Sequence, residues 1–161
     1  EFRRVLFRSG EWSQMSEMSP KEFKHILVGV DDSDDAQLAF RYAINRAKSD
    51  GAKLTIVSIL EQDNMNVYEA MSKDFVHGQR KDLEEHVMQY QKLARDFGVT
   101  DVNAVVDEGD PGETIVKTVI PALKPDLLVI GSVAKHGVRK YFGSQAAYMA
   151  KHAPISVLVI R

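Results

Sequence analysis

The sequence predicts an α/β domain: a doubly wound, five-stranded parallel sheet sandwiched between helices. Two observations carry this prediction. Five short runs are continuously apolar and rich in β-branched residues, which is typical of strands buried on both faces of a sheet. Amphipathic helical patterns lie between these runs, and such alternation indicates a parallel sheet covered on both sides. Right-handed crossovers then make the doubly wound arrangement the most economical topology.

The first strand is expected at His25–Val30 (HILVGV), and a helix is expected over Asp34–Asp50. Ser33 or Asp34 can cap the start of this helix, and Gly51 can supply the left-handed residue that ends it. Apolar residues recur along the segment at the spacing of one helix face. They are Ala36, Ala39, Phe40, Ala43, Ile44 and Ala47.

Lys53–Leu60 (KLTIVSIL) is expected to form the second strand, followed by the polar stretch Glu61–Asn66. A long helical region then runs to Phe97, and Gly98 closes it. Because glycine weakens a helix, Gly78 predicts either two helices or one kinked helix. The apolar face of this region consists of Leu83, Val87, Tyr90, Ala94 and Phe97.

The third strand is expected at Val102–Val106, and a strong helix start follows it. Asp110 is a good N-cap, Pro111 is suited to the first helical position, and Glu113 can complete a capping box. We expect this helix to end or kink before Pro121, because proline lacks an N–H and clashes with the preceding turn.

The fourth strand is expected at Asp126–Ile130, the final helix at Gly143–His152 and the fifth strand at Ile155–Ile160. The fifth strand is short and apolar, and we place it at the edge of the sheet. An apolar edge invites pairing with another chain, so the sequence predicts a homodimer formed through this strand.

Composition excludes several classes of protein. The 161 residues suit one domain, and the absence of cysteine rules out disulfide scaffolds and thiol chemistry. A formal net charge of −2 gives no general attraction to nucleic acid. No apolar run approaches the roughly 20 residues that span a membrane. We therefore expect a cytoplasmic protein without a nucleic-acid or membrane partner.

The first residues are not expected to belong to the domain. Glu1–Ser9 (EFRRVLFRS) matches the in-frame translation of a common sequencing-adapter oligonucleotide, so we interpret residues 1–14 as a non-native extension. The true start would be Met15 or Met18. The alternative is a short disordered basic arm. Residues 15–23 are expected to form a flexible lead-in, and residues 24–161 the domain.

Two strand ends carry polar or glycine residues that could bind a ligand. In a doubly wound sheet, ligands bind outside the carboxyl ends of the strands, where the winding direction reverses. The first strand ends in Val30-Asp31-Asp32-Ser33. The fourth strand leads into the segment Gly131–Ser144, which joins it to the final helix.

The Gly131–Ser144 segment has the features of a phosphate-binding loop. Gly131 allows close approach of the backbone to a ligand, and Gly143 and Ser144 stand at a helix N-terminus that favours an anion. Four residues make the segment basic, namely Lys135, His136, Arg139 and Lys140. The alternative is an ordinary strand–helix connection with a solvated basic tip.

From Lys24 to Arg161 the chain resembles a universal stress protein. The residues that carry the resemblance are VDDS after the first strand, VVDEGDPGETIV, VIGS, and the closing GSQAAYMAKHAPISVLVIR. The resemblance implies an adenine-nucleotide α-hydrolase-like, Rossmann-like fold. Many members of this family bind ATP, and members commonly dimerise through the last strand.

The signature of the ATP-binding members is Gly, two residues, Gly, nine residues, Gly, then Ser or Thr. Gly131 matches the first glycine, and Gly143 and Ser144 match the last pair. Ala134 stands at the second glycine, with eight residues before Gly143, so this part of the loop departs from the signature.

The resemblance also implies a role for each site residue. Asp31 would hydrogen-bond the nucleoside, with Val30 beside it, and Ile59 would lie against the adenine. The ribose–phosphate path would be lined by Gly131, Ser132 and Ala134. N–H groups would reach the phosphates from Gly143, Ser144, Gln145 and Ala146. The alternatives are that Asp31 caps the following helix and that Ile59 belongs to the core.

We therefore predict a protein that binds ATP or a related adenine nucleotide, as Mg-ATP or AMP, as a regulatory ligand in stress response. One alternative is a dimeric interaction module without nucleotide, and another is a slow ATPase on the same site. The histidine spacing predicts no metal site, and no serine-hydrolase or P-loop motif is present. The pair Asp31-Asp32 resembles the acidic pair of a phospho-receiver domain. A receiver also needs a phosphorylatable Asp at the end of its central strand and a Lys at the end of a later strand. Here glycine follows Asp126–Ile130, and the last strand ends in Arg161. We predict no catalytic residue.

Overall fold

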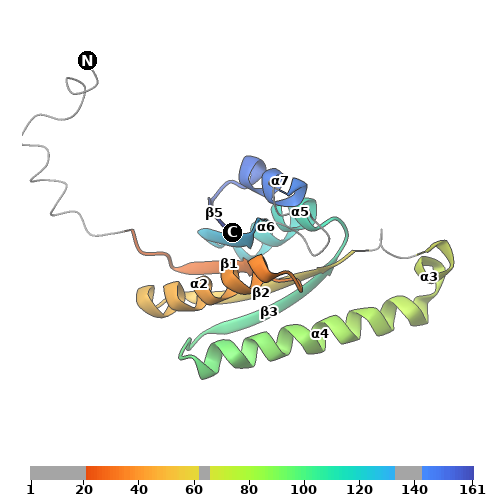
Figure 1. Cartoon of the computed structure of the whole chain (residues 1–161), viewed down its shortest axis with the longest axis horizontal. Helices are drawn as coiled ribbons and strands as arrows, with labels where there is room; N and C mark the ends of the chain where they lie inside the picture. The colour runs from red at the N-terminus through yellow and green to blue at the C-terminus, as the bar shows by residue number, and fades with distance from the viewer. Residues whose placement is uncertain (1–20, 62–65, 133–142) are drawn as a thin grey trace, which may run out of the picture.

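The computed structural model describes residues 21–61, 66–132 and 143–161. Five strands form one sheet in the order β3-β2-β1-β4-β5, and every neighbouring pair is parallel, as Figure 1 allows the reader to follow. The predicted fold class is confirmed. The strands are β1 (His25–Gly29), β2 (Lys53–Leu60), β3 (Val102–Glu108), β4 (Leu127–Gly131) and β5 (Ser156–Ile160).

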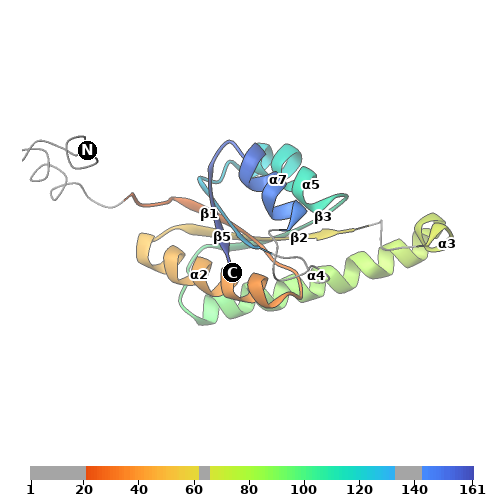
Figure 2. The ribbon, with the colours of Figure 1, turned by 45° about the horizontal axis from the view of Figure 1, so that its top comes forward.

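Helices cover both faces of this sheet. Figure 2 shows α2 and α4 below the sheet and α5 and α7 above it. The described helices are α2 (Asp34–Asp50), α3 (Val67–Met71), α4 (Lys73–Asp96), α5 (Pro111–Thr114), the π-helix η3 (Ile115–Val119), α6 (Ile120–Leu123) and α7 (Ser144–His152).

Alternate residues of β1 feed two separate cores. Ile26 and Val28 belong to the core under α2 and α4, whereas Leu27 belongs to the core under α5, η3, α6 and α7. All three side chains are fully buried, which explains why this strand is continuously apolar in the sequence. Because β1 pairs with β2 on one side and β4 on the other, the winding direction reverses between β1 and β4.

The helix α2 begins and ends as predicted. The Ser33 side chain accepts a hydrogen bond from the Ala36 N–H at 3.1 Å, and Gly51 ends the helix with a φ of 63°. The six alanine, phenylalanine and isoleucine side chains expected on its inner face are all buried.

The long helical region differs from the prediction in two respects. The break lies at Ser72, whose hydroxyl caps α4 by accepting from the Phe75 N–H, and α4 continues through Gly78 without interruption. Gly78 is exposed with open space around it, so nothing in the packing forces a break there. Phe97 was expected on the buried face but is 58% exposed, because it caps the helix end beyond the last buried residue, Ala94.

The α-helix α5 that follows the N-cap Asp110 ends at Thr114, before Pro121 as expected, but helical structure continues through the proline as η3 and α6. The π-helical turn η3 stands directly before the proline, and the Ile120 N–H bonds the Ile115 carbonyl, five residues back. Pro121 then occupies the first turn of α6, where no intrahelical N–H is required. The helix ends at Lys124, which takes a φ of 52°.

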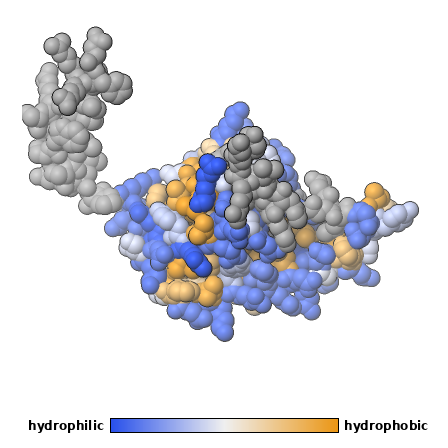
Figure 3. Space-filling model, viewed as in Figure 1, coloured by the Kyte–Doolittle hydropathy of each residue, from blue (hydrophilic) through white to orange (hydrophobic). Residues whose placement is uncertain are grey.

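The strand β5 lies at the edge of the sheet, as predicted, and pairs with β4. Its side chains Val157, Leu158, Val159 and Ile160 are only partly buried. Apolar side chains accordingly interrupt the hydrophilic surface near the C-terminus in Figure 3.

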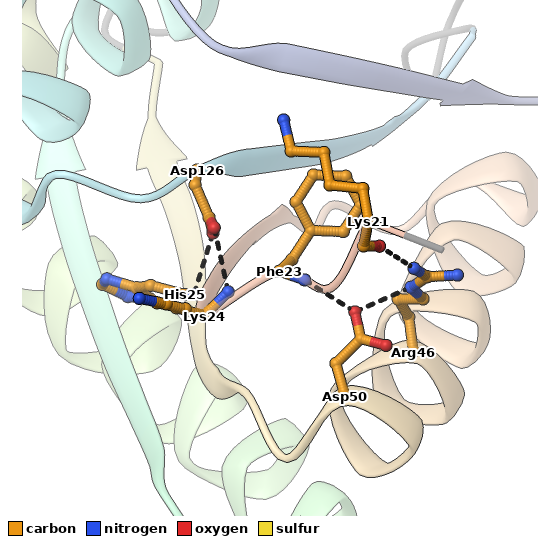
Figure 4. Close-up of polar contacts among 7 residues, drawn as sticks. All are labelled: Lys21, Phe23, Lys24, His25, Arg46, Asp50 and Asp126. Atoms are coloured by element: carbon orange, nitrogen blue, oxygen red, sulfur yellow. Dashed lines mark hydrogen bonds and ion pairs between the residues drawn. The ribbon is translucent and has the colours of Figure 1, made fainter. Parts of the chain in front are cut away.

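At the amino ends of the strands, carboxylates hold the backbone that enters β1. The two carboxylate oxygens of Asp126 accept hydrogen bonds from the Lys24 and His25 N–H groups, each at 2.9 Å (Figure 4). The His25 ring contacts the Thr55 hydroxyl at 2.8 Å, which links β1 to β2.

The lead-in to β1 is held in the same way. Asp50 accepts from the Phe23 N–H at 2.9 Å and pairs with Arg46 at 2.8 Å, and Arg46 also donates to the Lys21 carbonyl (Figure 4). The Phe23 ring packs against the core. Among the described residues, Lys21 and Phe23 therefore already contact the domain, ahead of the expected boundary at Lys24.

Candidate functional site

A cavity of about 220 Å³ opens at the carboxyl ends of β1, β2 and β4, beside the N-termini of α2, α5 and α7. This is the place where the winding direction reverses. Nine of the ten residues named from the sequence line it: Val30, Asp31, Ile59, Gly131, Ser132, Gly143, Ser144, Gln145 and Ala146. Ala134 lies outside the described residues, as do the basic residues between 133 and 142.

Other lining residues were missed by the sequence analysis. They are Gly29, Ser33, Ala36, Val57, Ser58, Glu61, Pro111, Ile115, Ile130 and Met149. Most belong to strand ends or to the first turn of a helix at the same edge of the sheet. The order of the strands was the signal that could have found them, because it determines which ends are neighbours.

Asp31 forms a tight turn at the end of β1. Its Oδ1 accepts from the Ser33 N–H at 2.8 Å, and Ser33 in turn caps α2. The structure therefore gives the capping role to Ser33, which was one of the residues proposed for it. Asp31 is exposed at the cavity, and the turn uses only one of its two carboxylate oxygens.

Ser132 connects three elements at the end of β4. Its N–H donates to the Ile160 carbonyl at 2.8 Å, its carbonyl accepts from the Gly143 N–H at 2.9 Å, and its hydroxyl donates to Asp35 Oδ2 at 2.7 Å. The side chain is buried. Its hydroxyl thus attaches β4 to α2, and the expected place of Ser132 on the ribose–phosphate path stays a prediction.

Gly131 is required by the same contact. A Cβ at this position would lie 2.8 Å from both the Ala36 nitrogen and the Asp35 carbonyl carbon. Gly131 was expected to allow close approach of a ligand, and that role stays a prediction. The structure shows that it allows close approach of β4 to the first turn of α2.

The N-terminus of α7 faces the cavity. Gly143 is its N-cap and supplies no side-chain cap, and the first helical hydrogen bond is donated by Ala147 to the Gly143 carbonyl. The N–H groups of Ser144, Gln145 and Ala146 therefore have no partner within the helix. A helix end of this kind favours an anion through both its N–H groups and its dipole.

The side chain of Gln145 joins α7 to α5. Its Oε1 accepts from the Gly112 N–H at 2.7 Å, and its Nε2 donates to Asp110 Oδ2 at 2.7 Å. Asp110 is at the same time the N-cap of α5 through the Glu113 N–H. A Cβ on Gly112 would lie 2.7 Å from Gln145 Oε1, so glycine is needed for this contact as well.

The floor of the cavity is apolar. Ile59 is half-buried and packs against the second core together with Val57, Ile115 and Ile130, so it belongs both to the core and to the cavity. Met149 of α7 completes this surface. Asp31 and Glu61 are the ionisable side chains among the described lining residues. The cavity thus combines an apolar floor, two carboxylates and a helix N-terminus.

Within residues 21–61, 66–132 and 143–161, no group of three or more histidine, aspartate or glutamate side chains is arranged to hold a metal ion. Over the same ranges, no helix has the length and apolar character needed to cross a membrane.

The topology and the cavity define the class: a doubly wound α/β protein with a cavity at the carboxyl edge of its parallel sheet. The chain belongs to the universal stress protein family, whose family model matches residues 22–161.

Curated relatives support this assignment. A universal stress protein from Staphylococcus haemolyticus is 36% identical over 140 residues, which cover 86% of this chain and 85% of that protein. A second, from Staphylococcus aureus strain USA300, is 33% identical over 140 residues, covering 86% of this chain and 84% of that protein.

Solved structures share the fold. The universal stress protein UspA from Lactobacillus plantarum has a TM-score of 0.78 at 26% identity, covering 88% of this chain and all (100%) of that one. A universal stress protein in complex with cAMP has a TM-score of 0.66 at 23% identity, covering 88% and 99% of the two chains. The Archaeoglobus fulgidus protein in complex with dAMP has a TM-score of 0.63 at 21% identity, covering 88% and 100%.

Proposed function

We propose that the cavity binds ATP or a related adenine nucleotide, and that the protein uses this nucleotide as a regulatory ligand in the stress response of the cytoplasm. The observation that carries the proposal is the convergence of nine sequence-predicted residues on one cavity. These residues come from β1, β2, β4 and α7, and they meet where a doubly wound sheet places its ligand.

The three parts of the cavity suit the three parts of a nucleotide. The apolar floor suits the base, and the second carboxylate oxygen of Asp31 is placed to accept from a nucleoside hydroxyl or amine. The N–H groups at the start of α7 suit a phosphate. The complexes of two family members with cAMP and dAMP agree with an adenine nucleotide.

We further propose that the protein is a homodimer formed through β5. The strand lies at the sheet edge with β4 on its other side, and its apolar side chains are only partly buried. An edge of this kind is suited to strand pairing with a second copy. Sedimentation at micromolar concentration should give the mass of two chains; the mass of one chain would contradict the proposal.

The nucleotide proposal is tested by mass spectrometry of ligand that co-purifies with the native protein, followed by ATP titration. A bound nucleotide stabilises the folded state, so ATP should raise the melting temperature of the wild type. Gly143→Trp should remove this rise, because the indole would occupy the N-cap of α7, whose φ of −62° accepts a side chain. Gly78→Trp, at an exposed site on α4, is the matched control and should respond to ATP like the wild type.

Absence of any adenine nucleotide from the native protein, together with no thermal shift at millimolar ATP, would contradict the proposal and favour a dimeric interaction module. Phosphate release that depends on Asp31 would instead favour the slow ATPase. A regulatory ligand should remain intact over the time of the titration.

A further inference from the structure

The glycines of this protein differ in whether the fold requires them. Gly51, Gly98 and Gly109 adopt positive φ values of 63°, 102° and 134°, which other residues rarely take. Gly112 and Gly131 are in contacts that a Cβ would disrupt, each with a neighbouring atom closer than 3.0 Å. In both groups the local backbone or packing explains the glycine.

Gly29 belongs to neither group. It has no positive φ, and a Cβ built on it would lie 3.4 Å from Ile130 Cγ2 and 3.9 Å from Ile115 Cδ1, which are ordinary contact distances. Glycine in a strand costs stability, because it loses more backbone entropy on folding and packs no side chain. Alanine would therefore fit the fold at this position at least as well.

The missing side chain of Gly29 leaves space in the cavity. Side chains alternate along β1, so Gly29 points to the same face as Leu27, which is fully buried in the second core. Ile115 and Ile130 belong to that core as well, and both line the cavity next to Gly29. On this face of β1, Leu27 fills the space beside it, whereas Gly29 has no side chain to do so. The cavity therefore extends toward the second core at Gly29.

We infer that Gly29 sets the depth of the cavity and thereby favours a two-ring base over a one-ring base. The inference rests on the proposed nucleotide site. A flat purine is long enough to reach the apolar surface formed by Ile115 and Ile130, whereas a pyrimidine leaves the space beside Gly29 unfilled. Apolar contact with the deeper part of the floor is then available only to the larger base.

The experiment compares Gly29→Ala with the matched control Gly78→Ala in the full chain. Each protein is titrated with ATP and with CTP by calorimetry, and its melting temperature is measured without ligand. The wild type should bind ATP more tightly than CTP. Because one methyl-sized change in an apolar pocket alters affinity on the order of tenfold or more, Gly29→Ala should lose about that factor for ATP and clearly less for CTP.

The melting temperature separates this role from a structural one. Gly29→Ala should melt at or above the wild-type temperature, and Gly78→Ala, in the exposed interior of α4, should melt higher with unchanged affinities. In Gly29→Ala the ATP affinity should therefore fall while stability is kept or rises. In Gly78→Ala only stability should change.

Three results would overturn the inference. Unchanged ATP affinity in Gly29→Ala, or equal losses of affinity for ATP and CTP, would show that Gly29 does not determine selectivity for the size of the base. A lower melting temperature would show that the fold requires the glycine. If the wild type bound neither nucleotide, the proposed function would fail as well, which distinguishes that outcome from failure of the inference alone.

Discussion

The two ends of the same sheet are built for different purposes. At the amino ends of the strands, Asp126 accepts from two backbone N–H groups, and Asp50 accepts from one backbone N–H and from Arg46. At the carboxyl ends, helix N-termini and the side-chain-free surface of Gly29 surround a cavity. Parallel strands bring all their starts to one edge and all their ends to the other. The protein therefore separates contacts that stabilise the fold from groups left available to a ligand.

The largest effect is expected at Gly131, where one residue serves both the fold and the cavity. Gly131→Ala places a Cβ 2.8 Å from the backbone of α2, so it should both destabilise the fold, by about 3 kcal/mol, and abolish nucleotide binding. Urea denaturation and ATP titration measure the two effects. Gly78→Ala is the control, since its Cβ meets nothing within 4 Å. A stable Gly131→Ala variant would show that β4 can move away from α2.

Substitutions at the amino ends of the strands should change the stability of the fold and leave ATP affinity unchanged. Asp126→Ala leaves the Lys24 and His25 N–H groups without their carboxylate, and we expect a loss of about 2 kcal/mol in the free energy of unfolding. The ATP affinity of the folded variant should equal that of the wild type. Asp101→Ala, an exposed aspartate before β3, provides the control. A change in ATP affinity in Asp126→Ala would contradict the separation of the two ends.

Ser132 should show a smaller, mixed effect, because it lines the cavity while its hydroxyl holds Asp35 of α2. Ser132→Ala removes the hydrogen bond to Asp35, which should cost about 1 kcal/mol and weaken ATP binding by loosening the junction of β4, α2 and α7. Asp35→Asn retains an oxygen acceptor and should be milder.

A double-mutant cycle between the two positions measures the coupling directly. Ser49→Ala, on the exposed side of α2, is the matched serine control. Additive effects of Ser132→Ala and Asp35→Ala, each of which removes the contact, on both stability and affinity would show that it has no role in positioning the site.

These contacts show where sequence reasoning succeeds. The strands and α2 follow from local periodicity and caps, so their positions were predicted to within a few residues. The site residues followed from strand ends and from the family resemblance, since both depend on position along the chain.

Side-chain partners across the fold were not predictable in the same way. Ser132 and Asp35 are 97 residues apart, and Gln145 and Gly112 are 33 apart, so no local pattern records either contact. Gly78 was misinterpreted for a related reason. Whether glycine breaks a helix depends on its surroundings, and here it lies in open space on an exposed helix.

The smallest expected effect is a pH dependence at the amino end, arising from His25. Burial is the main cause that lowers the pKa of His25, the charge of Lys53 lowers it further, and Asp126 and Asp101 oppose the shift. The folded state therefore favours neutral His25, and the unfolded state binds more protons once the pH falls below about 6.5. This contribution to stability is fully present above that pH and declines as the pH falls toward the lower pKa of the folded state.

His25→Gln removes the titration and can still contact the Thr55 hydroxyl. The difference in unfolding free energy between wild type and His25→Gln should therefore be constant above about pH 7 and should shift against the wild type below about pH 6. His77→Gln, on the exposed surface of α4, is the matched histidine control. A difference that does not vary with pH would mean that His25 keeps its ordinary pKa, and that the amino end of the sheet is more open to water than the carboxylate contacts around it imply.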